Sequence, residues 1–385
     1  MKKLTIYILI ALFLLTGKAY AQSQAEEASK KGMNFLQDGK CDEAIAEFTK
    51  AIETNPKDAV AYNNRAASYA TEGKFDEAIA DFSKAIEIDP GYPQTYANRG
   101  DVYIDKGNLD QAIADCNKAI SMNPNYASAY CNRARAYTKK GKLDEATADC
   151  NKALQINPDS SKANFILGII FDMKSRPDEA ITYFTKALTI NPGNIRAYYN
   201  RGCAYEKTGR PEQAIDDLNK AIEMNHNYAA AYDERGRIYQ KMANIDQAIS
   251  DYEHAMKIDK KYASPDYAKA YKIRADRDED NNKIDLAIAD YGKAIELDPK
   301  YARAYNLRGF CYGIKHYVKQ AIADFNKTLE IDPKYTEAHY NLAVAYFDIK
   351  DYDKSWEALH KAEELGYKAN PKFVKNLKKV SGREK

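Results

Sequence analysis

The feature that most constrains this chain is a repeat with a period of 34 residues. Prolines that follow an acidic or amide residue mark the period, at Pro56, Pro90, Pro124, Pro158 and Pro192, and again at Pro299 and Pro333. The next two steps of 34 residues after Pro192 fall on His226 and Lys260, so the period continues there without proline. The step from Lys260 to Pro299 is 39 residues, which shows that five residues are inserted, best placed at 263–267. A fixed period of this length predicts a linear array in which each unit buries its apolar face against its neighbours.

Ten units fit the period, and they begin at positions 25, 59, 93, 127, 161, 195, 229, 268, 302 and 336. The eighth place of every unit is Gly or Ala, and the twentieth is Ala in nine of the ten. The eleventh place is aromatic in nine units, and a Gly such as Gly73 separates the two halves of five of them. Small and large residues at these spacings predict two antiparallel helices per unit, because small residues let helices approach and aromatic residues fill the gaps between them.

This pattern resembles the tetratricopeptide repeat (TPR) family, and the resemblance covers residues 25–369. It implies an all-α protein, a right-handed α-solenoid of about ten helical hairpins whose first helices line a concave, partner-binding groove. Repeats one to seven would cover 25–262 and repeats eight to ten 268–369, on either side of the insertion. Phe373, Leu377 and Val380 share one helical stripe, so residues 370–385 are expected to form a capping helix and tail.

One departure from the family pattern recurs: seven units carry Arg in the seventh place, where the family has Leu. The same seven units carry Asp in the twenty-third place, giving the pairs Arg65 and Asp81, Arg99 and Asp115, Arg133 and Asp149, Arg201 and Asp217, Arg235 and Asp251, Arg274 and Asp290, and Arg308 and Asp324. The units with Leu167 and Leu342 have Tyr183 and Ala358 instead, and the first unit has Lys31 with Glu47. The matched occurrence predicts a structural salt bridge inside each unit.

Residues 1–21 have the layout of a secretory signal peptide, with Lys2 and Lys3 before a short apolar run and a small-x-small ending at Ala21. Cleavage is expected after Ala21, and the alternative is an N-terminal membrane anchor. Removing three Lys from the 58 basic residues leaves 55 against 56 acidic ones, a net charge of −1. An exported protein, periplasmic or secreted, is therefore predicted, without general affinity for nucleic acid or anionic membranes.

No enzymatic activity, cofactor or metal site is predicted. The sequence contains no P-loop, GxGxxG, GxSxG or HExxH motif, and the residues outside the repeats are too few for a catalytic domain. The six Cys fall at small or apolar places of the repeat, so core thiols are expected rather than disulfides. Asp276, Asp278 and Asp280 alternate as in a calcium loop, but Asn281 and Ala287 stand where such a loop needs Gly and Glu.

The resemblance assigns the second, fifth, sixth, ninth, twelfth and thirteenth places of each unit to the groove. The sixth place carries Asn64, Asn98, Asn132, Asn200 and Asn341, which would hold a peptide backbone or be solvated amides. The fifth unit offers an apolar set four residues apart, Phe165, Ile169 and Met173. Basic residues flank that set: Arg135 and Lys139 before it, and Lys207, Arg237 and Lys241 after it.

The predicted function is a protein-interaction scaffold of the cell envelope that binds an apolar anchor flanked by acidic residues. The fifth-unit set would be the anchor site, unless it is additional core. A structural spacer with an inert groove and an accessory subunit of an envelope enzyme are the alternatives. Groove chemistry changes from unit to unit, from Asp101 and Asp105 in the third to Asp276 and Asp280 in the eighth, and this favours the scaffold.

Overall fold

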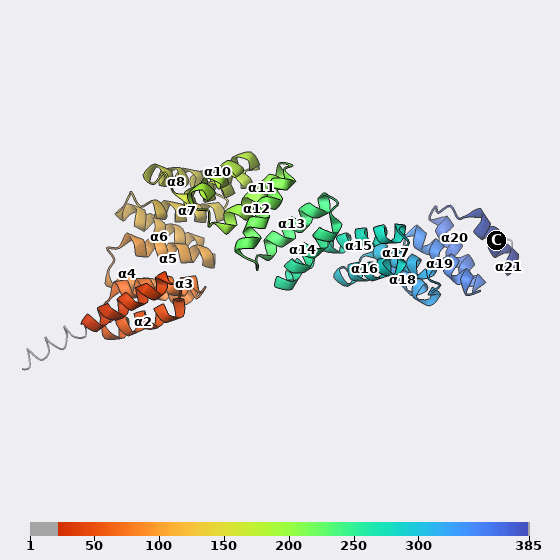
Figure 1. Ribbon diagram of the computed structural model, residues 1–385, viewed down its shortest axis with the longest axis horizontal. Helices are drawn as coiled ribbons and strands as arrows, with labels where there is room; N and C mark the ends of the chain where they lie inside the picture. The colour runs from red at the N-terminus through yellow and green to blue at the C-terminus, as the bar shows by residue number, and fades with distance from the viewer. Residues whose placement is uncertain (1–21, 384–385) are drawn as a thin grey trace, which may run out of the picture. The chain divides into compact units, whose positions relative to one another are not determined.

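A computed structural model describes residues 22–383, so the predicted signal peptide and its cleavage site at Ala21 lie outside the described residues. The chain divides into two compact units after Thr208, and each is described by itself (Figure 1). The first contains a helix over residues 22–37, α2 (Cys41–Thr54), α3 (Ala59–Thr71), α4 (Phe75–Ile88), α5 (Pro93–Lys106), α6 (Leu109–Met122), α7 (Ala127–Lys139), α8 (Leu143–Ile156), α9 (Ser161–Met173), α10 (Pro177–Ile190) and α11 (Ile195–Lys207). Every element between residues 22 and 208 is helical, as predicted.

The second unit continues the same alternation of helices. It contains α12 (Pro211–Met224), α13 (Ala229–Lys241), α14 (Ile245–Ile258), the 3₁₀ turn η1 (Lys260–Tyr262), α15 (Pro265–Asp280), α16 (Ile284–Leu297), α17 (Ala302–Ile314), α18 (Val318–Ile331), α19 (Thr336–Asp348), α20 (Tyr352–Glu364) and α21 (Pro371–Ser381). Each unit is an α-solenoid of antiparallel hairpins, and the predicted capping helix is α21. In that helix Leu377 is fully buried and the ring of Phe373 packs edge-on against Tyr340, whereas Val380 is exposed.

In most repeats the core of the hairpin is a large side chain on the second helix that packs against the small eighth residue of the first. The ring of Phe184 is fully buried, and a Cβ added at Gly168 would lie 2.4 Å from it. Cys116 and Cys150 hold the same place in their repeats as Phe184 and are fully buried, as expected for core thiols. Burial raises the pKa of Cys116 to about 12, which makes its thiol unreactive near neutral pH.

The turn inside each hairpin places its fifteenth residue in the left-handed conformation. Five of the ten repeats supply Gly there, with φ between 72° and 89°, as at Gly107. The other five supply Ser175, Ala243, Asn282, His316 and Lys350, with φ between 57° and 64°. The left-handed conformation costs an L-residue about 1–2 kcal/mol, so packing of the two helices imposes the turn even where the sequence lacks Gly.

The five inserted residues do not form a separate loop. The turn η1 precedes them, and Pro265, Asp266 and Tyr267 extend the N-terminus of α15. The ring of Tyr267 is buried, 5.4 Å from that of Tyr252 and 5.0 Å from that of Tyr271. The insertion therefore adds to the core of the second unit.

The predicted salt bridge inside each repeat is confirmed in six repeats. Each guanidinium donates through Nε and Nη2 to the two carboxylate oxygens, at 2.6–2.9 Å. The seventh pair, Arg201 and Asp217, has one member in each compact unit and stays a prediction. The first repeat differs from the expectation: Lys31 pairs with Glu27 at 2.8 Å and Glu47 with Lys50 at 2.5 Å, because partners on the same helix are nearer.

The arginines also link neighbouring repeats, a contact that the repeat pattern alone does not indicate. Five of them donate a further hydrogen bond to the twenty-fifth residue of the preceding repeat: Thr49, Ser83, Asn117, Thr185 and Asn219. Tyrosines in the fourth and eleventh places lie 5.2–6.0 Å from the guanidinium carbon, within cation–π range. This layered set accounts for much of the tyrosine content and is structural.

Candidate interaction surface on the first helices

The first helices of the hairpins form the inner layer of each unit. Consecutive first helices contact one another, as α5 does with α7 and α17 with α19, while the main neighbours of each second helix are the first helices before and after it. An array built in this way curves with its first helices inside. The concave surface is therefore made by exposed residues of the helix over 22–37 and of α3, α5, α7, α9 and α11 in the first unit, and of α13, α15, α17 and α19 in the second.

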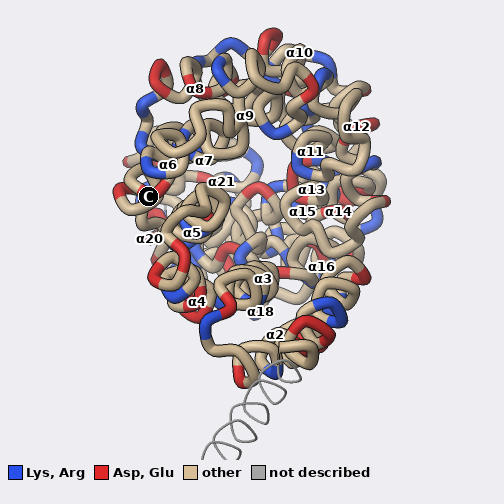
Figure 2. Tube along the Cα trace, turned by 90° about the vertical axis from the view of Figure 1, so that its left-hand side faces the viewer, with Lys and Arg blue, Asp and Glu red and all other residues tan. Residues whose placement is uncertain are grey.

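Most charges on this surface are paired within the protein. Arg135 donates to Asp101 at 2.6 Å and also binds Asp105, so the acidic third repeat and the basic fourth repeat neutralise each other. Lys139 donates to the carbonyl oxygen of Ile104 at 3.0 Å, near the C-terminus of α5. Figure 2 shows the two signs interspersed along the helices. Neighbouring repeats therefore already supply partners for Arg135 and Lys139, and a role of these two residues in binding an external acidic partner stays a prediction.

The basic residues expected after the apolar set behave similarly. Lys207 binds both carboxylate oxygens of Asp172 at 2.7 Å. Arg237 binds Asp233 one turn earlier on its own helix, and Lys241 is exposed. Surface ion pairs of this kind contribute at most about 1 kcal/mol to the free energy of unfolding. Their main effect is therefore on the charge of the groove rather than on the stability of the fold. No run of free positive charge flanks the fifth repeat in the part of the first unit that the structure describes.

The asparagines in the sixth place have different surroundings. Asn132 is 4% exposed and donates to the carbonyl oxygen of Ala97 at 2.9 Å, so it cannot bind a ligand backbone and that expectation is corrected. Asn200 donates to the carbonyl of Arg196 on its own helix at 2.6 Å. Asn64 contacts the sulfur of Met33 at 3.2 Å, and Asn98 is half-buried. A backbone-binding role stays a prediction for Asn64, Asn98 and Asn200.

The apolar set of the fifth repeat is divided by the structure. Phe165 and Ile169 are half-buried and pack against the core of α10 and α11, with the Phe165 ring 5.8 Å from that of Phe184. Only Met173 is largely exposed, at 51%. The interpretation that all three residues are surplus to packing is therefore wrong, because a half-buried ring on a first helix also covers the hairpin behind it.

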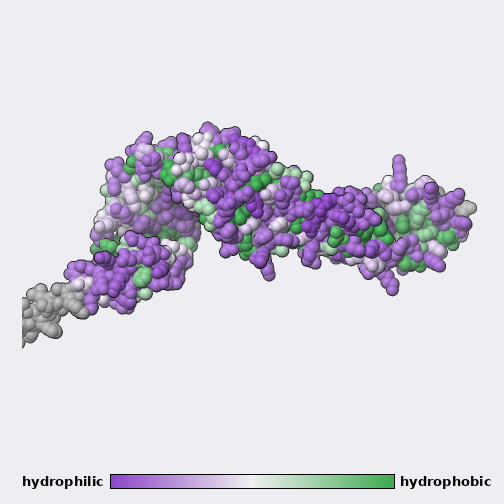
Figure 3. Space-filling view, viewed as in Figure 1, coloured by the Kyte–Doolittle hydropathy of each residue, from purple (hydrophilic) through white to green (hydrophobic). Residues whose placement is uncertain are grey.

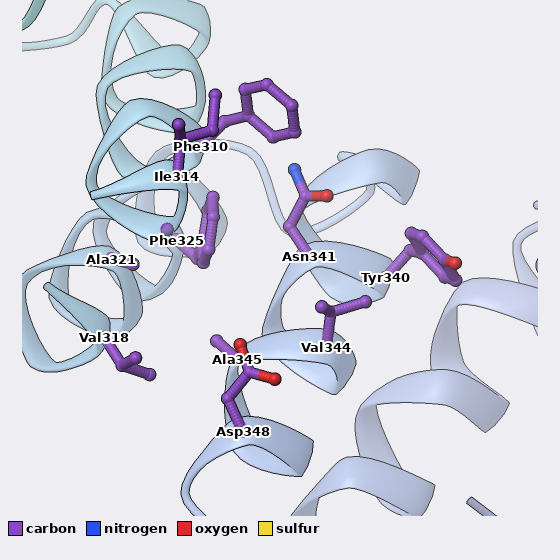
Figure 4. Close-up of a pocket in the computed structure, with 11 residues that line it drawn as sticks. Phe310, Ile314, Val318, Ala321, Phe325, Tyr340, Asn341, Val344, Ala345 and Asp348 are labelled. Carbon is purple, nitrogen blue, oxygen red and sulfur yellow. The ribbon is translucent and has the colours of Figure 1, made fainter. Parts of the chain in front are cut away.

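An apolar opening lies in the second unit, between the ninth and tenth repeats. Its volume is about 320 Å³, at the lower end of ligand-binding pockets. Figure 4 shows the residues that surround it: Phe310 and Ile314 on α17, Val318, Ala321 and Phe325 on α18, and Tyr340, Asn341, Val344, Ala345 and Asp348 on α19. We call it the α17–α19 pocket. Figure 3 shows one face of the molecule, on which hydrophilic residues predominate and hydrophobic ones gather in patches.

The walls of the α17–α19 pocket are exposed and its floor is closed. Phe310 is 44% and Ile314 45% exposed, whereas Ala321 and Phe325 are buried beneath them. The amide of Asn341 donates to Asn306 at 3.1 Å, which leaves its own carbonyl oxygen free to accept. Burial raises the pKa of Asp348, while His316 lowers it. The pocket can hold one bulky apolar side chain beside a carboxylate.

The sequence contains a signal for this pocket in the positions of its wall residues. Phe310, Ile314 and Val344 occupy the ninth, thirteenth and ninth places of their repeats, which the family resemblance assigns to the groove. Phe310 and Ile314 are four residues apart on one helix, but Val344 lies on the next first helix, and no spacing within one repeat connects it to them. The sequence-based prediction of the binding residues therefore did not include them.

The comparisons with known proteins identify the family. Profiles described as tetratricopeptide repeat match residues 59–92, 127–160 and 195–228, and others of that description match 82–114, 157–195 and 229–262. Profiles described as TPR repeat match 100–140, 276–313 and 318–365. This chain belongs to the tetratricopeptide repeat family.

Individual relatives are similar over short stretches or in part. Hsp70-Hsp90 organizing protein 1 of Glycine max is 51% identical over 45 residues, which is 12% of this chain and 8% of that protein. The protein of the same name from Arabidopsis thaliana is 50% identical over 44 residues, 11% of this chain and 8% of that protein. A tetratricopeptide repeat protein structure from Parabacteroides merdae is 22% identical with a TM-score of 0.49, covering 62% of this chain and 94% of the other.

The described residues contain neither a candidate membrane span nor a candidate metal cluster. None of the helices between residues 22 and 383 has the length and apolar character needed to cross a membrane. No group of three or more His, Cys, Asp or Glu within the same range is arranged to hold a metal ion. The acidic run considered for calcium lies on α15, where Asp276 pairs with Lys272 and accepts from Tyr291, so the loop that a calcium site needs is not formed.

Proposed function

We propose that this protein is a non-catalytic scaffold of the cell envelope that binds a partner protein through the concave surface of its first helices. The observation that carries the proposal is the α17–α19 pocket, an apolar opening whose walls are exposed on the first helices. Exposed apolar surface with a polar rim is typical of contact sites in soluble proteins. Family membership supports the binding of protein partners in general.

The location in the envelope is part of the proposal and rests on residues 1–21. Their basic start, short apolar run and small-x-small ending are typical of a secretory signal peptide. The short matches to the organizing proteins cover less than a tenth of those proteins, so the partners in their names are not transferred to this chain.

Affinity capture with matched variants tests the proposal. Residues 22–385 would be immobilised and exposed to an envelope extract, and captured proteins would be identified by mass spectrometry. Phe310→Ser removes an exposed ring of the pocket, and Ile349→Ser is the control because Ile349 is also exposed, at 48%, but does not line the pocket. We expect a partner that the original chain and Ile349→Ser capture and Phe310→Ser does not.

A result that contradicts the proposal is equally clear. If all three proteins are folded by circular dichroism and capture the same proteins to the same extent, the pocket does not bind the partner. If none of them captures anything above the bare matrix, the groove is inert and the chain is a structural spacer.

A further inference from the structure

We propose that the α17–α19 pocket recognises a partner segment in which a bulky apolar residue is followed or preceded, within two positions, by Lys or Arg. This inference rests on the proposed function and specifies the chemistry of the partner. It differs from the sequence-based expectation, which placed an acidic partner at the fifth repeat.

The apolar half of the motif follows from the shape of the pocket. Phe310 and Ile314 are one turn apart on α17, and Val344 lines the pocket from α19 (Figure 4). All three contribute surface that is open to solvent or half-open, above a floor that is closed by Phe325. An apolar side chain of the partner would be desolvated on three sides there, which is the setting in which single residues dominate binding energy.

The basic half follows from the carboxylates around the pocket. Asp348 lines it, and no Lys or Arg among the described residues lies within 4.0 Å of that carboxylate. Asp280 holds the thirteenth place of the eighth repeat, the same place that Asp105 holds in the third. The carboxylate of Asp105 binds Arg135, which is the ninth-place residue of the next repeat. In the ninth repeat that residue is Phe310; Asp280 does not line the pocket, but it lies on α15, the first helix that precedes α17. A cation suits this rim and an acidic partner does not.

The array itself shows why the Asp348 carboxylate lacks a partner from the next repeat. In the first unit, groove carboxylates are paired by a cation from the next repeat: Asp105 by Arg135, and Asp172 by Lys207. Asp348 belongs to the tenth repeat, which is followed by the helix α21 instead of an eleventh first helix. The cation that the next repeat would supply is therefore absent from that position, and a bound partner can supply it.

The spacing within the motif follows from helix and strand geometry. Val344 and Asp348 are four residues apart on α19, which is about 6 Å along the helix axis. Residues i and i+2 of an extended segment are about 6.6 Å apart and point to the same side. A side chain in the pocket and a cation on Asp348 can therefore come from residues two positions apart in an extended segment.

A peptide selection tests the inference. A phage library of random nine-residue peptides would be selected on residues 22–385 and on three variants, Val344→Arg, Asp348→Lys and Asp353→Lys. Asp353→Lys is the charge-matched control, because Asp353 is exposed on α20 and lies outside the pocket. Selected peptides would then be synthesised, labelled with fluorescein and titrated by fluorescence polarisation.

We expect the original chain and Asp353→Lys to enrich peptides with Leu, Ile, Met or Phe beside Lys or Arg. Val344→Arg should lose about tenfold in affinity for them, as is usual when an anchor site is destroyed. Asp348→Lys should lose about fivefold, the upper range for a surface ion pair, and should itself enrich peptides with Asp or Glu in the basic position. Asp348→Asn replaces Asp348→Lys if the reversed charge prevents folding.

Two outcomes overturn the inference. Enriched peptides without a basic residue, or full affinity for Asp348→Lys, would show that the carboxylate does not select the partner. Peptides whose affinity is unchanged by Val344→Arg would place binding elsewhere in the groove. That result would contradict the inference but not the proposed function. If no peptide is enriched and no envelope protein is captured, both fail.

Discussion

Replacement of Arg133 by Leu is the most direct test of how the repeats are held together. Arg133 donates to the two carboxylate oxygens of Asp149 at 2.8 and 2.6 Å, and to Asn117 of the preceding repeat at 2.6 Å. Its guanidinium carbon lies 5.6 Å from the ring of Tyr130 and 6.0 Å from that of Tyr137. Leu at this place would leave the Asp149 carboxylate without a cation between two helices.

The expected cost follows from the burial of the pair. Removing one partner of a fully buried ion pair costs about 3–5 kcal/mol, whereas exposed pairs are worth less than about 1 kcal/mol. The Arg133 side chain is 21% exposed and that of Asp149 is 8% exposed, so the pair is close to the buried limit. We expect Arg133→Leu to lower the local free energy of unfolding by about 3 kcal/mol.

The fifth repeat provides the compensating change. It has Leu167 in the seventh place, and Tyr183 in the twenty-third stacks on Phe171 with ring centroids 5.1 Å apart. The double variant Arg133→Leu, Asp149→Tyr reproduces this arrangement, because the new tyrosine ring could stack on Tyr137. It should recover all but about 1 kcal/mol of the loss, since no charge remains buried.

Hydrogen exchange of the α7 and α8 amides, read by mass spectrometry, measures the local effect without assuming two-state unfolding of the whole array. A loss of about 3 kcal/mol corresponds to roughly 150-fold faster exchange. Lys84→Leu removes an exposed pair with Glu87 and should change nothing measurable. Additive effects of the two single changes in a double-mutant cycle would refute the coupling between Arg133 and Asp149.

Other tests address single features of the chain. Ala243→Gly should stabilise the second unit by about 1 kcal/mol in urea unfolding, because Ala243 has φ of 61° and Gly removes the steric cost; destabilisation would show that the turn is not strained. Phe165→Ser and Ile169→Ser should each lower the free energy of unfolding by about 1–2 kcal/mol, whereas Met173→Ser should not, because Met173 is largely exposed. Equal effects of the three substitutions would contradict the finding that only Phe165 and Ile169 belong to the core. Sequencing of the exported protein should find an N-terminus directly after Ala21, and an intact residue 1 would overturn the predicted cleavage.

The repeat period accounts for most of the fold. Small and aromatic places recur in phase, so the hairpins and the order of the helices follow from it. The pairing of Arg with Asp was predictable because the two residue types appear and disappear together from repeat to repeat. The location of the cap followed from its apolar stripe and from the need of the last repeat for a neighbour.

Packing between repeats controls which groove residues are available to a partner. Arg135 and Asp105 are 30 residues apart in sequence, and they meet only because consecutive first helices pack side by side. The same packing covers Phe165 and Ile169, and it brings Phe310 opposite Val344 to form the α17–α19 pocket. Contacts between repeats depend on how one hairpin is set against the next. Spacing within a repeat does not specify that geometry, and so the sequence pattern predicts the array, while the packing of one hairpin on the next determines its surface.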